Sequence, residues 1–258
     1  MITFSIITCT YNAESVLKRT LHSVLEQTYP YVEHIIWDGA SEDHTMDMVD
    51  EYLHEDEQKE TRHQIVVSSE PDGGLYFAMN KAIKKATGTY LVFLNAGDVF
   101  PASDTLEVIA NSIGDGEALP GVIYGDTDIV DEEGHFLRHR RLTPPEKLSW
   151  KSFKYGMLVC HQSFYAQADI AKDVLYNTNY RYSADVDWCI RIMKVCSEKK
   201  LKLKYVHHVF TNYLDGGMSI KNHRASLKER FRVMQTHYGW ITTVMMHIWF
   251  VLRSMIKK

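Results

Sequence analysis

The stretch YLVFLNAGD, residues 90–98, places three residues that could bind a ligand directly after an apolar run. Its first five residues are typical of a buried strand, whereas Asn95, Gly97 and Asp98 supply an amide, a glycine and a carboxylate. A carboxylate at the end of a core segment needs a partner, because removing its charge from water is unfavourable. The end of this stretch is therefore a candidate binding site.

Polar residues also follow the other apolar runs of the first half. Thr10 and Tyr11 come after the first run, Asp38 after the second, and the turn EPDGG (70–74) after the third. In an open α/β sheet, ligands bind beyond the carboxyl ends of the strands. If the four runs are parallel strands, their polar ends converge on one site.

The segments between these ends predict helices, so that strands and helices alternate. Residues 13–27 carry apolar side chains at helical spacing, and Asn12 is placed to cap that helix. The charged run 54–62 is expected as a solvated connection. We expect strands at 3–10, 32–37, 64–68 and 90–94, and further helices ending near 53 and spanning 75–86. This alternation predicts an α/β fold with a mainly parallel central sheet and helices on both faces.

The rhythm changes in the second half, from a boundary near Gly97. The pattern predicts a hairpin (122–130 with 135–142), strands at 157–165 and 201–213, a helix at 183–195, and two helices from about 221 as a C-terminal appendage. The helix at 183–195 would carry Asp185 and Asp187 in its first turn, where the helix dipole stabilises carboxylates whether or not they catalyse.

Composition narrows the class of protein. The chain has 258 residues and a formal charge of −4, so no global basic field favours nucleic acid. Its four cysteines show no metal-site or disulfide spacing, and we expect reduced core thiols in a cytoplasmic protein. The N-terminus has no basic segment or cleavage site of a signal peptide. No apolar stretch is long enough for a transmembrane helix.

Five motifs carry a resemblance to a known family. In order, SIITCTYN, IIWDGASEDHT, SEPDGGLYFAMNKAIKKATG, YLVFLNAGD and SADVDWCIRIMK resemble glycosyltransferase family 2, which has the GT-A fold. The resemblance covers roughly residues 1–215 and is strongest to members that build bacterial capsule, exopolysaccharide or O-antigen units. It implies a nucleotide-diphosphate sugar donor, a divalent cation (Mn²⁺ or Mg²⁺) and transfer with inversion at the anomeric carbon.

The resemblance also assigns roles to residues. Asp98 would meet the metal and the diphosphate, and Asp185 would be the catalytic base. His161 and Gln162 match a pair near the acceptor side, and Asp187 is expected as a supporting carboxylate that can pair with an arginine four residues later. The donor and nucleotide side of the site would comprise Thr10, Tyr11, Asp38 (to the base), Asn80, Asn95 and Gly97 (giving phosphate room).

The acidic motif departs from the commoner family pattern, which has several aspartates. Asn95 and Gly97 occupy two of those places, which leaves Asp98 as the single acid. Mg²⁺ and Mn²⁺ prefer hard oxygen ligands and take few of them from protein, so one carboxylate can suffice. Asp126 and Asp128 are a rival pair, because residues i and i+2 of a strand share a face.

Two further segments carry expectations. The glycine-rich segment 216–219 resembles a loop that could close over the diphosphate. The apolar segment 241–252, followed by Arg253 and two lysines, is expected either to pack on the domain or a homodimer partner, or to lie on the inner face of the cytoplasmic membrane. The basic run 135–141 could share that membrane surface.

The favoured interpretation is an inverting glycosyltransferase that moves a sugar, with UDP-sugar as the favoured donor, to a saccharide hydroxyl on a lipid-linked intermediate of bacterial surface polysaccharide synthesis. A polyprenyl-phosphate glycosyltransferase and an inactive sugar-nucleotide-binding domain are the alternatives. Residues 1–220 would form the GT-A domain, with a nucleotide-binding half (1–98) and an acceptor half (99–220). Residues 221–258 would form the C-terminal helices.

Overall fold

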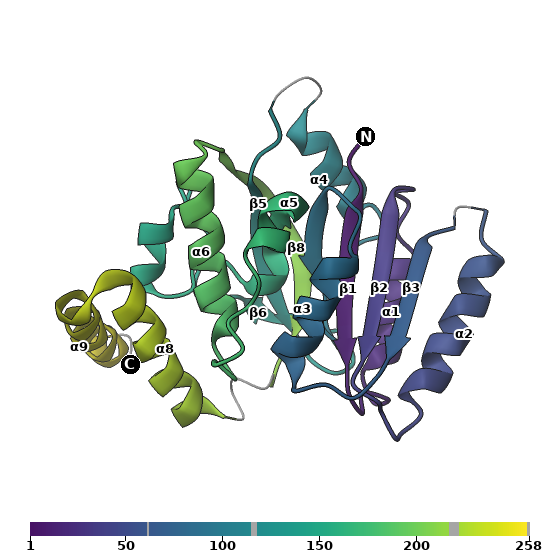
Figure 1. The fold of residues 1–258 in the computed structure, drawn as a ribbon, viewed down its shortest axis with the longest axis horizontal. Helices are drawn as coiled ribbons and strands as arrows, with labels where there is room; N and C mark the ends of the chain where they lie inside the picture. The colour runs from purple at the N-terminus through teal and green to yellow at the C-terminus, as the bar shows by residue number, and fades with distance from the viewer. Residues whose placement is uncertain (61, 115–117, 217–221, 257–258) are drawn as a thin grey trace.

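The computed structural model describes the chain except for residues 61, 115–117, 217–221 and 257–258 and the side chains of 254–256. The described residues build one mixed sheet of eight strands, in the order β3-β2-β1-β4-β7-β5-β6, with β8 also paired to β5 (Figure 1). The strands are β1 (Phe4–Thr10), β2 (Val32–Asp38), β3 (Gln64–Ser69), β4 (Tyr90–Phe93), β5 (Val122–Val130), β6 (Phe136–His139), β7 (Phe164–Gln167) and β8 (Leu203–Leu214).

Helices cover both faces of this sheet, as the alternation predicts. Strand side chains alternate between faces, so Ile7 and Ile35 pack in the core under α3, whereas Ile6 and Ile36 pack on the opposite side with α1, α2 and α4. The helices are α1 (Leu17–Leu25), α2 (Thr45–Glu57), α3 (Leu75–Lys85), α4 (Thr105–Ile113), α5 (Ala168–Asp173), α6 (Ala184–Glu198), α8 (His223–Tyr238) and α9 (Trp240–Ile256), with 3₁₀ helices η1 (Trp150–Tyr155) and η2 (His161–Ser163).

The two halves of the chain share the sheet. Strands β1 to β4 run parallel, with Phe4 opposite both Val32 and Tyr90. Strand β7 then pairs antiparallel with β4, where Tyr90 lies opposite Gln167, and antiparallel with β5. Strand β5 runs parallel to β8 and antiparallel to β6. The expected mainly parallel sheet is therefore confirmed, and the antiparallel pairs of the second half make it mixed.

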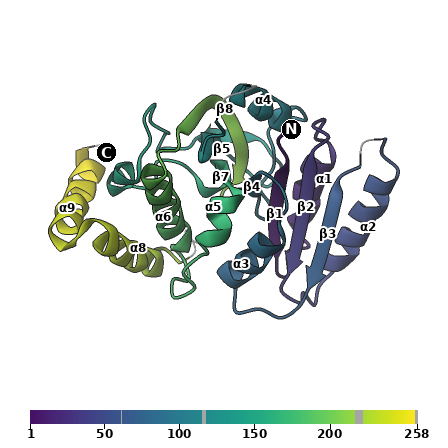
Figure 2. The ribbon, with the colours of Figure 1, turned by 45° about the horizontal axis from the view of Figure 1, so that its top comes forward.

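The C-terminal helices lie at one end of the molecule. Figure 2 shows α8 between α6 and α9, with α2 at the opposite end. Asp187 of α6 contacts His237 of α8 at 2.8 Å, and α9 packs on α8 and η1. None of the helices in the described part of the chain is both long and apolar enough to cross a bilayer.

The expected cap of the first helix is wrong. Helix α1 begins at Leu17, and Asn12 has a positive φ of 48°. The Asn12 side chain instead accepts a hydrogen bond from the backbone N–H of Glu42 at 2.9 Å. Asn12 therefore joins the loop after β1 to the loop after β2, which a local capping rule does not anticipate.

The charged run 54–62 is not simply a solvated connection. Helix α2 continues to Glu57, and Asp56 is turned inward, where its Oδ1 lies 3.4 Å from Nδ1 of buried His63. Asp56 lies on the inner side of α2, and a mostly charged segment can form a helix that buries one face. This is why part of the run is helical instead of a solvated connection.

The expected strand at 157–165 is also wrong in its position. The 3₁₀ helix η2 occupies His161–Ser163, closed by a hydrogen bond from the Ser163 N–H to the Cys160 carbonyl at 3.0 Å, and β7 starts only at Phe164. His161 and Gln162 therefore sit on a turn that re-aims their side chains. All four cysteines are buried and free, as expected.

Candidate active site

A cleft of about 1240 Å³ opens at the carboxyl ends of β1 and β4. Four expected site residues line it: Thr10 and Tyr11 at the end of β1, and Asn95 and the expected metal ligand Asp98 after β4. The turns before α2 and α3, the loop before α6 and the end of β8 complete its walls. The cleft thus lies where open α/β sheets bind ligands.

Asp98 lines this cleft although only 3% of the residue is exposed. Its Oδ1 accepts a hydrogen bond from the Leu214 N–H at 3.0 Å, and its Oδ2 accepts one from Gln162 Nε2 at 2.8 Å. Burial raises the pKa of Asp98 to about 7, even though both N–H donors act to lower it. The protein alone therefore compensates the negative charge of this carboxylate poorly. A cation beside Asp98 would stabilise the charged form and gain an oxygen ligand.

Asn95 and Gly97 play different parts in the same turn. The Asn95 Oδ1 atom is buried without a hydrogen-bond partner and belongs to a residue that lines the cleft, so it is available to a donor group or a cation. Gly97 has a φ of +99°, and a Cβ there would lie 2.6 Å from Leu214 Cδ2. The turn and Leu214 therefore require a glycine at this position for packing, and Gly97 is not among the residues that line the cleft. Its expected role in giving the phosphate room stays a prediction.

Asp38 is fully buried behind the cleft wall and already accepts four hydrogen bonds. Burial raises its pKa, but the donors on Ser41, Ser69 and Thr10 outweigh that effect and leave the pKa below its ordinary value. The side chain does not line the cleft. The structure therefore does not favour direct contact between Asp38 and a nucleotide base.

The cleft is acidic. Among the described residues that line it, Arg181 is the single lysine or arginine. A nucleotide diphosphate would meet net repulsion on such a surface unless a divalent cation bridged them, and carboxylate and amide oxygens are suitable ligands for that cation. The lining carboxylates are Glu42, Asp72, Asp98, Glu132 and Asp215.

Asp72 lines the cleft but received no role from the sequence. Its Oδ1 accepts a hydrogen bond from the Gly74 N–H at 2.6 Å. A Cβ added to Gly39 would lie 3.2 Å from Asp72 Oδ2 and 3.3 Å from Tyr11 Cδ2, so these three residues converge at one end of the cleft. The carboxylate in the turn after β3 was the available signal, because it follows a strand end as Asp98 does.

Asp185 lies beside the cleft, in the first turn of α6. The Tyr76 hydroxyl, on a residue that lines the cleft, donates to Asp185 Oδ1 at 3.4 Å. Burial and the Asp185 charge raise the pKa of Tyr76 well above its ordinary value. The segment before α6 is held by Glu229 of α8, whose carboxylate accepts from the backbone N–H groups of residues 181–183 at 2.7 to 3.1 Å.

Asp187 points away from the cleft, toward α8. It accepts hydrogen bonds from Arg191 Nε at 2.7 Å and from His237 Nε2 at 2.8 Å. Burial raises the pKa of Asp187, but these partners outweigh it and hold the pKa below its ordinary value. The predicted contact with Arg191 is present. The two carboxylates of α6 therefore differ in their partners: Asp185 lies beside the cleft, whereas Asp187 joins α6 to α8.

The remaining expected site residues lie behind the cleft. His161 stacks on Phe93 at 4.7 Å and contacts the Tyr176 hydroxyl, and burial lowers its pKa to about 4, so it is neutral near pH 7. Asn80 exchanges two hydrogen bonds with the Tyr176 backbone, at 2.7 and 3.0 Å. Gln162 supports Asp98 directly. These residues position others and do not themselves line the cleft.

Asp126 and Asp128 do line a second cavity, of about 250 Å³, but each already has a partner. Asp126 accepts from the Tyr205 hydroxyl at 2.8 Å, and Asp128 contacts His139 Nδ1 at 2.7 Å. Of the predicted closing segment 216–219, Gly216 lines the main cleft, and the other residues lie outside the described part of the chain.

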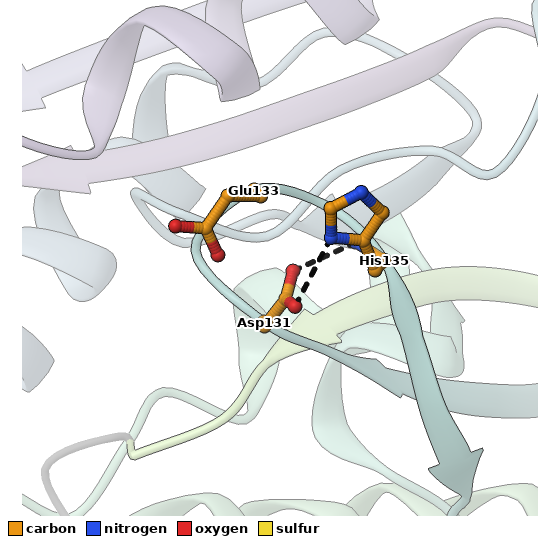
Figure 3. A group of neighbouring side chains, drawn as sticks. All are labelled: Asp131, Glu133 and His135. Carbon is orange, nitrogen blue, oxygen red and sulfur yellow. Dashed lines mark hydrogen bonds and ion pairs between the residues drawn. The ribbon is translucent and has the colours of Figure 1, made fainter.

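One acidic group at the β5–β6 turn has ligand atoms close together. Asp131, Glu133 and His135 lie within 4.8 Å of one another (Figure 3), and the His135 N–H donates to Asp131 Oδ1 at 2.7 Å. These side chains are half-buried or exposed. The hydrogen bonds of Asp131 close the hairpin turn, and this explains why the three side chains lie close together without a bound ion.

Comparisons with known proteins agree with this geometry. The model of glycosyl transferase family 2 matches residues 5–174. A PGL/p-HBAD biosynthesis glycosyltransferase of Mycobacterium bovis is 33% identical over 218 residues, which are 84% of this chain and 78% of that protein.

Solved structures show the same fold. TarS of S. aureus (residues 1–349) in complex with UDP-GlcNAc superposes with a TM-score of 0.71 at 18% identity, over 91% of this chain and 65% of that one. Mannosyltransferase PcManGT from Pyrobaculum calidifontis, in complex with GDP-Man and Mn²⁺, superposes with a TM-score of 0.63 at 16% identity, over 92% and 64%. This chain thus spans slightly less than two thirds of those proteins and has the GT-A fold. Together with the family match and the mycobacterial relative, these findings place the chain in glycosyl transferase family 2.

Proposed function

We propose that this glycosyltransferase is an inverting enzyme that takes its sugar from a nucleotide diphosphate, with UDP favoured. The observation that carries the proposal is the acidic cleft, in which the unpartnered Asn95 Oδ1 and the Asp98 carboxylate lie after one strand. Such a surface suits a diphosphate only when a divalent cation accompanies it. The solved complexes of TarS with UDP-GlcNAc and of PcManGT with GDP-Man and Mn²⁺ support this class of donor.

In this proposal Asp98 and Asn95 hold Mn²⁺ or Mg²⁺ together with the donor. A cation held there would supply positive charge that neutralises the departing diphosphate. Tyr11, exposed by 66%, offers a flat surface for the base, and Thr10 and Asp72 complete that end of the cleft. Asp38 keeps the hydroxyls of Thr10 and Ser41 in place and supports the base site from behind.

Asp185 is the proposed general base. The acceptor hydroxyl oxygen forms a bond to the anomeric carbon, the bond from that carbon to the diphosphate oxygen breaks, and the hydroxyl proton passes to Asp185. A single displacement of this kind inverts the anomeric carbon. The Tyr76 hydroxyl orients the carboxylate, and the Glu229 contacts fix the start of α6.

We assign the acceptor to a saccharide hydroxyl on a lipid-linked intermediate of bacterial surface polysaccharide synthesis. The resemblance to capsule and O-antigen enzymes supports this, as does a relative named for PGL/p-HBAD biosynthesis. We assign residues 1–220 to the GT-A domain, in which 1–98 bind the nucleotide and 99–220 provide the acceptor side, while Glu229 of the C-terminal helices holds the start of α6. The work of the enzyme would then be cytoplasmic, at the inner face of the membrane.

A donor screen and one substitution test the proposal. Nucleotide sugars with Mn²⁺ are screened by thermal shift, and turnover of the stabilising donor is measured for Asp185→Asn. Loss of a general base should lower kcat by about 10²–10⁴-fold while donor affinity stays within a factor of about two. A loss of kcat below about fivefold would contradict the base assignment and favour a phosphate acceptor, which needs little base help.

Asp169→Asn is the matched control. Asp169 also lies in the first turn of a helix, α5, but is exposed. It should keep wild-type turnover. If Asp169→Asn lost activity as Asp185→Asn does, the effect would reflect general charge near helix termini and not a specific base.

A further inference from the structure

The outward face of α9 is a continuous apolar stripe. Five large side chains recur at positions i, i+4, i+7, i+8 and i+11, which places them on one side of a helix. Each is 47% to 71% exposed. Trp240 and Val251 flank the stripe and are 61% and 59% exposed. The stripe consists of Ile241, Met245, Ile248, Trp249 and Leu252.

The inward face of the same helix carries its polar groups. Thr243 is fully buried and donates its hydroxyl to the Gly239 carbonyl at 2.8 Å. His247 Nδ1 lies 2.8 Å from the Thr243 carbonyl, and its ring contacts Phe231 of α8 at 4.8 Å. A helix on a water-exposed surface has its polar face outward and its apolar face inward. Because α9 has its apolar face outward, that face suits contact with an apolar environment.

The charge of the chain is divided between its two parts. Residues 223–258 hold seven lysines and arginines against one acid, whereas residues 1–222 hold 22 against 32 acids. The single acid, Glu229, is occupied by the backbone N–H groups before α6. Arg224, Lys228 and Arg232 of α8 are exposed. An apolar stripe beside a basic helix fits an anionic surface with an apolar interior.

We propose that α8 and α9 dock the protein on an anionic lipid bilayer, with the α9 stripe at the boundary of headgroups and acyl chains. A second copy of the chain is a poorer occupant, because a two-fold contact would bring two basic helices together. The suggestion that this contact brings the enzyme to a lipid-linked acceptor rests on the proposed function. The contact itself does not.

The proposed docking surface does not use the basic run 135–141. Arg138 pairs with Asp215 at 3.0 Å, and Arg140 donates to the carbonyls of Leu142, Met157 and Leu158. These arginines are therefore occupied within the protein. The expectation that this run joins the C-terminal helices at a membrane stays a prediction, and the docking proposal does not rest on it.

Vesicle flotation of the full chain tests the proposal. Phosphatidylcholine vesicles are compared with vesicles in which about one third of the lipid is phosphatidylglycerol. Wild type should partition at least about tenfold more strongly onto the anionic vesicles, and salt should reduce that difference. The double variant Ile248→Glu/Trp249→Glu should lose binding by about tenfold or more, because two apolar contacts are replaced by two repelled charges.

Phe136→Glu is the control, since Phe136 is 56% exposed on β6, away from α9. It should bind vesicles as wild type does, and thermal unfolding should confirm that all variants are folded. Equal partitioning of wild type and the stripe variant would overturn the proposal. So would a dimer seen by light scattering that the stripe variant breaks, without any vesicle binding. Asp98→Asn should still bind vesicles, so undiminished donor turnover by this variant, with intact vesicle binding, would count against the proposed function alone.

Discussion

The end of β2 and the loop after β4 present the same pattern in sequence and different environments in the structure. Each places an aspartate after an apolar strand, and both carboxylates are buried. Asp38 accepts four hydrogen bonds and its pKa lies below the ordinary value. Asp98 accepts two, and burial raises its pKa to about 7.

The difference separates a structural carboxylate from one that is suited to a ligand. Neither carboxylate is open to solvent, but burial penalises the charge of Asp98 more strongly, and Asp98 also has fewer hydrogen-bond donors to compensate that charge. Asp38 is satisfied internally and stabilises the loops around it. Asp98 leaves part of its charge for a partner in the cleft, and perturbed carboxylates of this kind gather at functional sites.

The largest expected effect is on turnover. Replacing Asp98 with Asn should lower kcat/KM by about 10²–10³-fold, since in the proposed function it removes the charge that would face the donor and its cation. Asp38→Asn, behind the cleft wall, should lower kcat/KM by less than about tenfold. Initial rates at several donor concentrations with saturating Mn²⁺ measure both. Similar losses for the two variants would remove the distinction.

The next largest effect is on stability, where substitution of Asp38 should have a larger effect than substitution of Asp98. Asp38→Ala leaves the hydroxyls of Thr10, Ser41 and Ser69 without their acceptor, and should lower the free energy of unfolding by about 2–4 kcal/mol. Asp98→Ala removes two contacts to a poorly compensated carboxyl and should be less destabilising. Urea unfolding with an unchanged m-value is the measurement. A larger loss for Asp98→Ala would mean that its burial is better compensated than the contacts indicate.

The smallest effect is a difference in pH dependence. In the native state Asp98 keeps its proton up to about pH 7, whereas in the unfolded chain it loses the proton near pH 4, so its stabilising contribution falls as pH rises between these values. Asp38, whose native pKa is lowered, loses its contribution as pH falls. Without metal, the free energy of unfolding of Asp98→Asn relative to that of wild type should therefore rise by about 1 kcal/mol per pH unit from pH 5 to 7. A constant difference would contradict the raised pKa.

Much of this site could be predicted from local sequence. Thr10, Tyr11, Asn95 and Asp98 follow apolar runs, and parallel strands bring their carboxyl ends to one edge of a sheet. The position of the cleft and these four lining residues therefore followed from strand periodicity. The parallel half of the sheet was predictable for the same reason. No contact between distant residues was needed for these expectations.

The states of individual side chains could not be predicted in this way. Ser69 reaches Asp38 from another strand, 31 residues away, and Gln162 reaches Asp98 across 64 residues. The turn at His161–Ser163 aims Gln162 at that carboxylate, although the sequence there is typical of a strand. Local patterns locate the ends of elements, whereas the charge of a buried group depends on partners that only the folded chain assembles.

The Glu229 carboxylate has a practical consequence for shortened versions of this enzyme. It holds the backbone N–H groups of residues 181–183 from a helix that an experimenter would readily remove to improve solubility. Cutting the chain before α8 would release the start of α6 and with it the position of Asp185. Such a version would lose activity even on a freely soluble acceptor, and its failure would say nothing about membranes, whereas a cut between Tyr238 and Trp240 would spare the Glu229 contacts.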